Sequence, residues 1–392
     1  MQNVSHRRDH GHLPRPQRTL STSPATAIEI GMKAAVCRAF NAPLSIEEVN
    51  LAAPGPEEVS VAVAAVAICH SDIAYIDDKW GGVLPAVYGH EAAGVVTVSN
   101  SDGFAPGDRV IVTLIRACGA CACCATGLET SCERRYDARP SPITDGHGNP
   151  VTQGMQCGAF AEAVTVHQSQ IHKAPDGMPL DVASLLACGV ITGYGAVTNT
   201  AGLAAGESAV VVGAGGVGLN AIQGAALSGA GKIVAVDRSA GKLEIARRFG
   251  ATHGVLADSA DVARQIIEIC DGRGADYAFV AVGAPQAFAQ APEYLAPGGA
   301  MVIVGMTGIH DEVSYMPVNL ASMNQRFLGS TMGQTVLARD LPILFDHYAQ
   351  GRLHLDELIT QRYPLAAINE ALDSTRAGVD GRNVVIVDET LL

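Results

Sequence analysis

Four cysteines lie close enough together in the sequence to bind one metal ion. Cys118, Cys121, Cys124 and Cys132 form a C-x2-C-x2-C-x7-C pattern on a loop rich in glycine and alanine. Four thiolates complete a tetrahedral shell around zinc and leave no position open, so such a site supports the fold and does no chemistry. Disulfides are the alternative, but the two-residue gaps crowd three thiols into one turn of chain. The pattern therefore predicts a structural zinc site within residues 118–132.

A second group of candidate ligands is dispersed along the chain. Cys69 and Cys188 each end an apolar run, and His90 lies between them in the sequence. A single cysteine is usually a small buried hydrophobe, and a single histidine is more often a satisfied core residue than a ligand. Two cysteines and one histidine, however, are a ligand set of catalytic zinc, which has three protein ligands and one open position.

A glycine-rich segment predicts a phosphate site. The sequence G-A-G-G-V-G follows three valines and opens a helical pattern. The first glycine permits a tight turn, the second lets backbone amides approach a pyrophosphate, and the last lets the helix pack on the strand. The residues that would bind the cofactor here are Gly213, Gly215, Gly216, Val217 and Gly218.

An acidic residue indicates which dinucleotide would bind. Asp237 ends the apolar run that follows the predicted helix. A carboxylate at this place accepts hydrogen bonds from both ribose hydroxyls of the adenosine and repels a 2'-phosphate. This favours NAD over NADP, although the adjacent Arg238 leaves use of both open. The alternative for Asp237 is a helix cap without a role in binding.

The chain divides into segments that would position these residues. Residues 32–188 contain short strand-like runs broken by glycine and proline, without a strong helical period, which predicts a β-rich domain. In residues 189–332 strands alternate with helices, which predicts an α/β domain with a doubly wound parallel sheet. Residues 333–392 are predicted to return to the first domain through a last strand, Asn383–Val387.

Composition narrows the class of protein. The 392 residues are 48% hydrophobic, enough for two domains with cores, and the net charge of −13 is opposite to that of a nucleic-acid binder. Six of the ten cysteines fall into the two metal patterns, so a reducing cytoplasm is expected. Residues 1–31 lack a signal-peptide core and are predicted to be disordered. The uncharged stretch 182–206 contains five glycines and is interpreted as buried core of the cofactor domain.

Together these motifs resemble the zinc-dependent alcohol dehydrogenases of the medium-chain dehydrogenase/reductase family. The resemblance covers about Met32 to Val387 and includes, in order, C-H-S-D, G-H-E, the four-cysteine lobe, C-G-V-I-T-G-Y-G-A and G-A-G-G-V-G-L-N. It implies a GroES-like catalytic domain that carries two zinc ions, and a Rossmann domain inserted into it. It also implies hydride transfer between an alcohol and NAD to give an aldehyde, in a homodimer or homotetramer.

The resemblance implies roles for individual residues. The two cysteines and the histidine of the dispersed group would bind a catalytic zinc, which lowers the pKa of a hydroxyl bound to it. Ser71 would bond to the substrate oxygen and take its proton. Asp72 would orient the histidine ligand, and Glu91 would lie behind the zinc.

Other positions match the family's cofactor and substrate contacts. Those matching contacts to the pyrophosphate, the adenosine ribose and the nicotinamide with its carboxamide are His70, Arg382, Lys242, Thr192, Val304 and Met306. Trp80 and Leu114 fall where family members place substrate-pocket side chains, with ordinary packing as the alternative for Trp80.

Two positions depart from the family pattern. Many members finish their proton relay with a histidine where this chain has Ala74, so the proton is expected to leave through water. Tyr136 stands where glutathione-dependent formaldehyde dehydrogenases keep an arginine, which argues against a glutathione adduct as substrate. We expect primary alcohols of moderate size, aliphatic, allylic or aromatic.

Three alternatives remain at this level. A polyol or secondary-alcohol dehydrogenase of the same family is disfavoured by Cys188, because many of those enzymes have a carboxylate at that ligand position. A non-catalytic dinucleotide-binding scaffold would bind one zinc per chain in place of two. A zinc-dependent nucleic-acid binder is disfavoured because the cysteine loop lacks long basic flanks.

Overall fold

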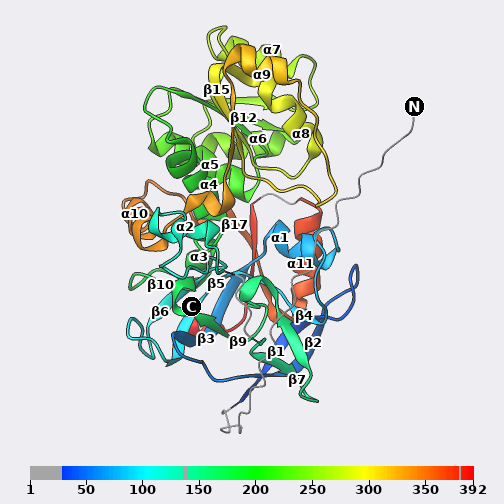
Figure 1. Cartoon of the computed structure of the whole chain (residues 1–392), viewed down its shortest axis with the longest axis vertical. Helices are drawn as coiled ribbons and strands as arrows, with labels where there is room; N and C mark the ends of the chain where they lie inside the picture. Colours follow the sequence, from blue (N-terminus) through cyan, green and yellow to red (C-terminus); the bar gives the residue numbers. More distant parts are fainter. Residues whose placement is uncertain (1–28, 136–139, 379–380) are drawn as a thin grey trace, which may run out of the picture.

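The computed structural model describes residues 29–135, 140–378 and 381–392. It has two lobes, with the catalytic domain below and the cofactor domain above in Figure 1. Most of the predicted tail, residues 1–28, and Tyr136 lie outside the described residues. The first strand begins at Ile30, two residues before the predicted domain boundary.

The catalytic domain is built from β-strands, as predicted. Five strands close a barrel in the order β1-β2-β7-β8-β4, and a seven-stranded sheet has the order β10-β6-β5-β3-β18-β17, with β9 also paired to β3. These strands are β1 (Ile30–Cys37), β2 (Ser45–Leu51), β3 (Glu58–Ala67), β4 (Ala86–Val87), β5 (Glu91–Ser99), β6 (Arg109–Val112), β7 (Ile143–Asp145), β8 (Pro150–Gln153), β9 (Ala163–His167), β10 (Ile171–Lys173), β17 (Ile359–Pro364) and β18 (Arg382–Ile386).

The long strand β3 organises this domain. It is apolar and buried along nearly its whole length, and it pairs antiparallel with β5, β9 and β18. Its antiparallel pairing with β18 joins the end of the chain to this sheet. The register opposes Ala67 to Glu91, so the residues just after β3 and just before β5 meet at one end of the sheet.

The cofactor domain contains a six-stranded parallel sheet. Its order β13-β12-β11-β14-β15-β16 corresponds to 3-2-1-4-5-6 along the chain, the doubly wound order that the sequence predicted. The elements are β11 (Ser208–Val212), α5 (Gly216–Leu227), β12 (Lys232–Asp237), α6 (Ala240–Arg248), β13 (His253–Leu256), α7 (Val262–Ile269), β14 (Ala275–Val280), α8 (Pro285–Gln290), β15 (Leu295–Ile303), α9 (Pro317–Met323) and β16 (Arg326–Gly329).

Several helices lie where no strong helical pattern was expected. In and next to the catalytic domain they are α1 (His70–Ile76), α2 (Ala122–Ala125), α3 (Leu180–Leu185) and α4 (Gly189–Gly195). Helices α10 (Leu337–Ala349) and α11 (Ile368–Arg376) agree with the one or two helices that the sequence predicts after residue 333. Helix α4 is not predicted from the sequence because its glycines are poor helix formers. They are nevertheless required, since a Cβ on Gly193 would lie 2.3 Å from the Val217 carbonyl oxygen of α5.

The stretch 182–206 lies where the two domains join. Its apolar side chains belong to a cluster that also contains Ile111 of the catalytic domain and Phe279 of the cofactor domain. The stretch folds as short helices, including α3 and α4. Within the described residues, every helix is too short or too polar to cross a bilayer.

Candidate metal and cofactor site

The dispersed ligand candidates come together in three dimensions. Ligand atoms of Cys69, His90, Glu91 and Cys188 all lie within 4.8 Å of one another. Cys69 precedes α1, His90 precedes β5, and Cys188 precedes α4. The pairing of β3 with β5 thus brings together Cys69, His90 and Glu91, and the segment before α4 at the domain junction supplies Cys188.

The histidine has one ring nitrogen bound and one free. His90 Nδ1 lies 3.0 Å from a carboxylate oxygen of Asp72, which can only accept, so Nδ1 carries the proton. Nε2 is buried and has no hydrogen-bond partner among the described residues. A buried imidazole lone pair beside two thiols is a donor set that fits zinc.

Asp72 connects the two segments that carry the ligand candidates. Its carboxylate is fully buried and accepts hydrogen bonds from the backbone N–H groups of Cys69 (3.1 Å) and Gly89 (2.9 Å) as well as from His90. Burial lowers the pKa of His90, but Asp72 and Cys69 outweigh this effect and raise the pKa above its usual value. Hydrogen bonding to Cys188 lowers the pKa of Cys69.

A buried ion pair links the cluster to the glycine-rich turn. Arg382 pairs with Glu91, whose other oxygen has no hydrogen-bond partner in the described part of the chain. Burial raises the pKa of Glu91, and the arginine opposes this effect. The Arg382 side chain lies against Gly216, where an added Cβ would be 2.3 Å from its Cδ. One guanidinium therefore reaches from the ligand cluster to the beginning of α5.

The glycine-rich turn has the geometry that a phosphate requires. Gly213 has φ of +95°, a left-handed conformation that glycine adopts freely. A Cβ on Gly218 would lie 1.7 Å from the Gly213 oxygen, so only glycine fits where the helix approaches the turn. Helix α5 begins without a side-chain cap, which leaves its first N–H groups available for an anion.

Asp237 does not cap the following helix. Ser239 is the N-cap of α6, and its side chain accepts a hydrogen bond from Lys242 N. The Asp237 carboxylate instead accepts from Ala214 N (2.8 Å) in the glycine-rich turn and from Ser239 N (3.0 Å). Arg238 forms an exposed ion pair with Asp258.

The four clustered cysteines form a separate site. Their sulfur atoms lie within 4.8 Å of one another, and Cys123 is not part of the group. Backbone N–H groups of Cys118, Cys121, Cys124 and Arg134 donate to these sulfurs at 3.3–3.5 Å. Such bonds lower the pKa of Cys121 to about 6, which favours the thiolate that binds metal.

The remaining predicted site residues are placed as follows. Ser71 lies in the first turn of α1 and is half-buried, whereas His70 beside it is exposed. Thr192 is buried in α4, Val304 is buried after β15, and Met306 is exposed. The indole N–H of Trp80 donates to the Thr307 carbonyl of the cofactor domain (2.9 Å), and Leu114 is half-buried against the catalytic-domain core.

Met332 is a neighbour of the ligand cluster that the sequence did not indicate. Met332 Sδ lies 3.6 Å from both Cys188 Sγ and Thr192 Oγ1. Methionine is common in cores, so its residue type carried no signal.

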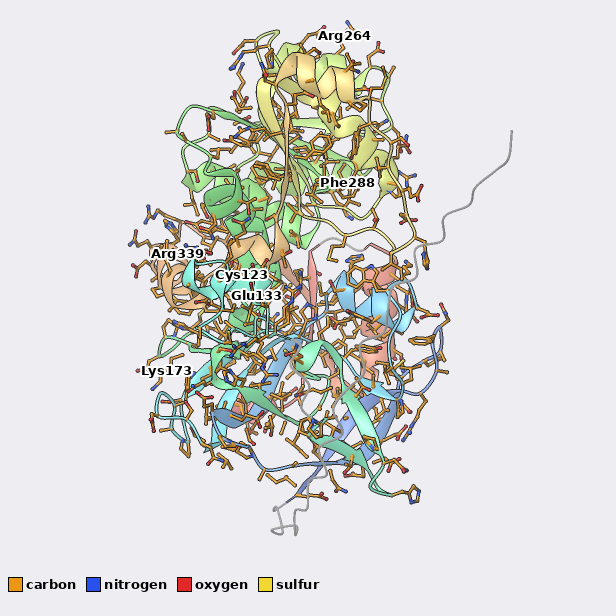
Figure 2. The ribbon with its side chains drawn as sticks, viewed as in Figure 1. Cys123, Glu133, Lys173, Arg264, Phe288 and Arg339 are labelled. Atoms are coloured by element: carbon orange, nitrogen blue, oxygen red, sulfur yellow. The ribbon has the colours of Figure 1, made fainter. Side chains whose placement is uncertain are left out.

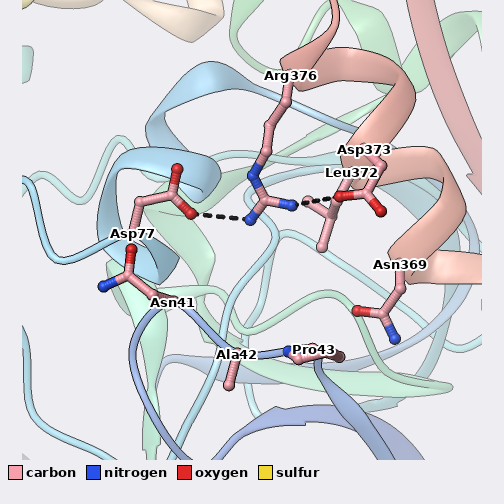
Figure 3. A pocket seen from close by; sticks show the side chains of 8 residues that line it. All are labelled: Asn41, Ala42, Pro43, Asp77, Asn369, Leu372, Asp373 and Arg376. Atoms are coloured by element: carbon pink, nitrogen blue, oxygen red, sulfur yellow. Dashed lines mark hydrogen bonds and ion pairs between the residues drawn. The ribbon is translucent and has the colours of Figure 1, made fainter.

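A surface pocket of about 320 Å³ separates the C-terminal end of α1 from α11. Figure 3 shows the Arg376 guanidinium between Asp77 and Asp373, at 2.8 Å from each carboxylate. The ion pair between Arg376 and Asp77 therefore connects α11 to the C-terminal end of α1, the helix that carries Ser71.

The fold and the two ligand clusters define a zinc-containing, nicotinamide-dependent oxidoreductase. Residues 55–176 match the family model of the alcohol dehydrogenase GroES-like domain, and residues 216–349 match that of zinc-binding dehydrogenases. The putative alcohol dehydrogenase D of Mycobacterium tuberculosis is 35% identical, over 90% of this chain and 99% of the relative.

Solved structures agree with this classification. An alcohol dehydrogenase zinc-binding domain protein from Burkholderia ambifaria superposes with a TM-score of 0.87 at 33% identity, covering 92% of this chain and all of that one. Benzyl alcohol dehydrogenase from Acinetobacter calcoaceticus gives 0.85 at 28% identity, covering 91% and 99%. The chain belongs to the zinc-dependent alcohol dehydrogenases of the medium-chain dehydrogenase/reductase family. The family, fold class, zinc dependence and NAD(P) binding predicted from the sequence are thereby confirmed.

Proposed function

We propose that this enzyme oxidises primary alcohols of moderate size with NAD, at the site formed by Cys69, His90 and Cys188. The observation that supports this most strongly is the unpartnered His90 Nε2, buried beside two thiols. Zinc bound there would act as a Lewis acid that makes a substrate hydroxyl more acidic. The four-cysteine cluster would bind the second, structural zinc.

The chain's own residues would position the reactants and move the proton. Ser71 would accept the substrate proton, and Asp72 would keep the His90 ring oriented by its hydrogen bond to Nδ1. Because the relay position is Ala74, which is buried, the proton would pass from Ser71 through the cofactor ribose to solvent. His70 and Arg382 would bind the pyrophosphate, and Glu91 would keep Arg382 in place through their ion pair.

Cofactor preference would depend on Asp237. Its carboxylate is held by Ala214 N and Ser239 N at the end of β12, where it would accept bonds from the ribose hydroxyls. The neighbouring Arg238 is paired with Asp258, which leaves it less suited to bind a 2'-phosphate. Lys242 would lie near the same ribose, and Thr192, Val304 and Met306 would lie near the nicotinamide.

The substrate range follows from the expected pocket. Trp80 and Leu114 would form apolar walls, and the small Ser71 would leave room above the ligand cluster. The structural similarity to a benzyl alcohol dehydrogenase supports aromatic alcohols as substrates. The second candidate, a polyol or secondary-alcohol dehydrogenase, is less favoured because the third ligand candidate is Cys188 and not a carboxylate.

One screen tests this proposal. Reduction of NAD and NADP is measured with aliphatic, allylic, aromatic, secondary and polyol substrates, and zinc per chain is counted by elemental analysis. We expect two zinc ions, activity with primary alcohols and preference for NAD. Faster turnover of secondary alcohols or polyols would contradict the substrate assignment, and one zinc without turnover would favour the scaffold alternative.

A homo-oligomer in the cytoplasm is part of the proposal. The edge strand β16 of the cofactor sheet has one free side, and exposed apolar residues lie on the segment before it. These residues are Met306, Ile309, Met316, Val318 and Met323. A second copy of the chain would cover them, because an exposed edge with apolar neighbours favours pairing. Sedimentation at micromolar concentration tests this, and a monomer would contradict it.

A further inference from the structure

A strained turn follows the last strand of the cofactor sheet. In the short helix η6 (Thr331–Gln334) three successive residues are left-handed, with φ of +48° at Met332, +63° at Gly333 and +48° at Gln334. Glycine adopts this conformation freely, but methionine and glutamine do so only where their surroundings hold them. The contacts that hold the turn should therefore be identifiable.

The turn packs directly against the backbone of α4, which leaves no room for a side chain at Gly333. A Cβ on Gly333 would lie 2.4 Å from the Ile191 oxygen and 2.9 Å from the Gly195 Cα. Thr335, just after the turn, donates its hydroxyl to the same Ile191 oxygen (3.3 Å). These contacts hold the inner side of the turn.

Two polar side chains hold its outer side. Asn199 Nδ2 donates to the Gly333 oxygen (3.1 Å) and to Asp340 Oδ2 (3.0 Å). Asp340 is only 4% exposed and also accepts from Val336 N (3.0 Å) and from Arg339. Asn199 lies in η4 (Ala196–Ala201), a single π-helical turn, a distortion that often occurs at functional sites.

The turn carries Met332 into contact with two proposed site residues. Its sulfur is 3.6 Å from Cys188 Sγ and 3.6 Å from Thr192 Oγ1. Both belong to the same helical segment, so a displacement of the turn would remove a packing partner from the thiol and the hydroxyl together.

We propose that Asn199 and Asp340 are positioning residues that hold the left-handed turn, so that Met332 fixes the side chains of Cys188 and Thr192. This rests on the proposed roles of these two residues at the metal and the nicotinamide. Neither Asn199 nor Asp340 touches the reacting atoms.

The four-cysteine lobe supports the same turn from outside. The short helix η1 (Glu129–Ser131), which ends next to Cys132, packs against η6. Arg339 acts electrostatically on Glu129, and Figure 2 shows Arg339 on the side of the molecule that carries Cys123 and Glu133 of the lobe. The lobe and the Asn199–Asp340 pair thus contact one turn from two sides.

The test compares two asparagines that make similar bonds in different places. Asn199→Leu keeps the approximate size and removes the amide at the turn. Asn369→Leu is the matched control, because Asn369 bonds to Leu44 N and O in the catalytic domain (2.9 Å each). For each purified zinc-loaded enzyme, melting temperature, NADH dissociation constant, kcat, KM and the rate of zinc release to a chelator are measured.

Asn199→Leu should weaken NADH binding about fivefold to tenfold, as expected for one hydrogen bond. It should lower kcat/KM further and release one of the two zinc ions at least about fivefold faster, because Cys188 is less well held. Asn369→Leu should lower the melting temperature similarly while NADH affinity and zinc release stay within about twofold. Asp340→Leu should resemble Asn199→Leu, because it removes the oxygen that accepts from Asn199 Nδ2.

Wild-type NADH affinity, zinc release and kcat/KM in Asn199→Leu would overturn the inference, as would equal effects in Asn369→Leu. These outcomes leave the proposed function intact if the wild-type enzyme binds two zinc ions and oxidises alcohols. A wild-type enzyme that binds one zinc and oxidises none of the alcohols would overturn the proposed function and, with it, this inference.

Discussion

At the scale of single residues, the hydrogen-bond partners of the buried polar atoms indicate which atoms are free to bind a metal ion. His90 Nε2 has no partner among the described residues, whereas Nδ1 is bound to Asp72. The two thiols beside it are close enough to share one cation with the imidazole. Catalytic and structural functions can therefore be separated by mutation, because the four other cysteines form their own cluster.

Cys188→Ala should lose one zinc per chain and at least about a thousandfold in kcat, since the charge stabilisation of a metal is worth several kcal/mol. The protein should still fold and bind NADH, because Cys188 contributes no side-chain hydrogen bond to the cofactor sheet. Zinc analysis, circular dichroism and NADH fluorescence check this. An enzyme that keeps both zinc ions and its turnover would show that Cys188 is not a ligand.

Asp237→Asn should lower kcat/KM for NAD roughly tenfold to a hundredfold, because a charge-assisted hydrogen bond is worth about 1.5–3 kcal/mol. The single amide oxygen can keep only one of the bonds from Ala214 N and Ser239 N, because these donate to different carboxylate oxygens, so the melting temperature is measured beside the kinetics. Asp258→Asn, which changes the exposed partner of Arg238, is the control and should change NAD kinetics little. Equal use of NAD and NADP by the unmodified enzyme would contradict the assignment.

Ser71→Ala should lower kcat by roughly 10²- to 10⁴-fold, the usual contribution of a positioned proton acceptor. NADH affinity should change much less than kcat, because the lost hydroxyl is only one of the groups beside the cofactor ribose in the proposed site. Ser71→Thr should restore most of the rate, whereas a crowded pocket would show as a higher KM for large alcohols. Near-normal turnover of Ser71→Ala would mean that protons leave by another route.

At the scale of elements, local sequence signals differ greatly in strength. The turn from β11 to α5 could be predicted because its glycines, the preceding valines and Asp237 are all needed within one short unit. Helices α1 and α4 could not be predicted, since seven residues show little periodicity and the glycines of α4 serve close packing against α5. The left-handed turn at Met332 was also missed, because contacts with α4 and Asn199 impose it and only one of its three left-handed residues, Gly333, favours it.

The ligand cluster, too, could be predicted from the sequence only in part. Cys69 and His90 are joined by the register of β3 and β5, which the sequence does not state. Their residue types, with Cys188, indicated a possible catalytic zinc set, and the family resemblance then implied the role of ligand for each of them. Neither the residue types nor the family resemblance indicated the contact of Met332 with Cys188, because it joins residues 144 positions apart through a strained turn.

The cysteine lobe is the element whose loss should affect stability first. Cys121→Ala should remove one zinc per chain and lower the melting temperature by about 5 °C or more, because a structural metal contributes directly to folding. Because η1 of the lobe packs against η6, NADH affinity should fall slightly as well. Cys123→Ala is the matched control, since Cys123 is outside the sulfur cluster. A full zinc content and unchanged melting temperature in Cys121→Ala would contradict the structural role.

At the scale of the whole molecule, one buried apolar cluster spans both domains, and each domain has a further cluster of its own. The largest buried cluster joins Ile111 of the catalytic domain, Leu186 and Ile191 of the junction, and Phe279 of the cofactor sheet. The Trp80–Thr307 hydrogen bond and the Glu91–Arg382 ion pair, which reaches the glycine-rich turn, add polar connections. A domain whose core continues into its neighbour has little independent stability.

Thermal unfolding should therefore proceed in one cooperative transition, although the chain has two domains by topology. NADH at about one hundred times its dissociation constant should stabilise the folded protein by about 2.7 kcal/mol. It should move the whole transition upwards by a few degrees, because one face of the cofactor sheet packs in the cluster that spans both domains. Calorimetry with and without NADH measures both effects. Two resolved transitions, with only one of them shifted by NADH, would show that the junction around Leu186 and Ile191 does not couple the domains.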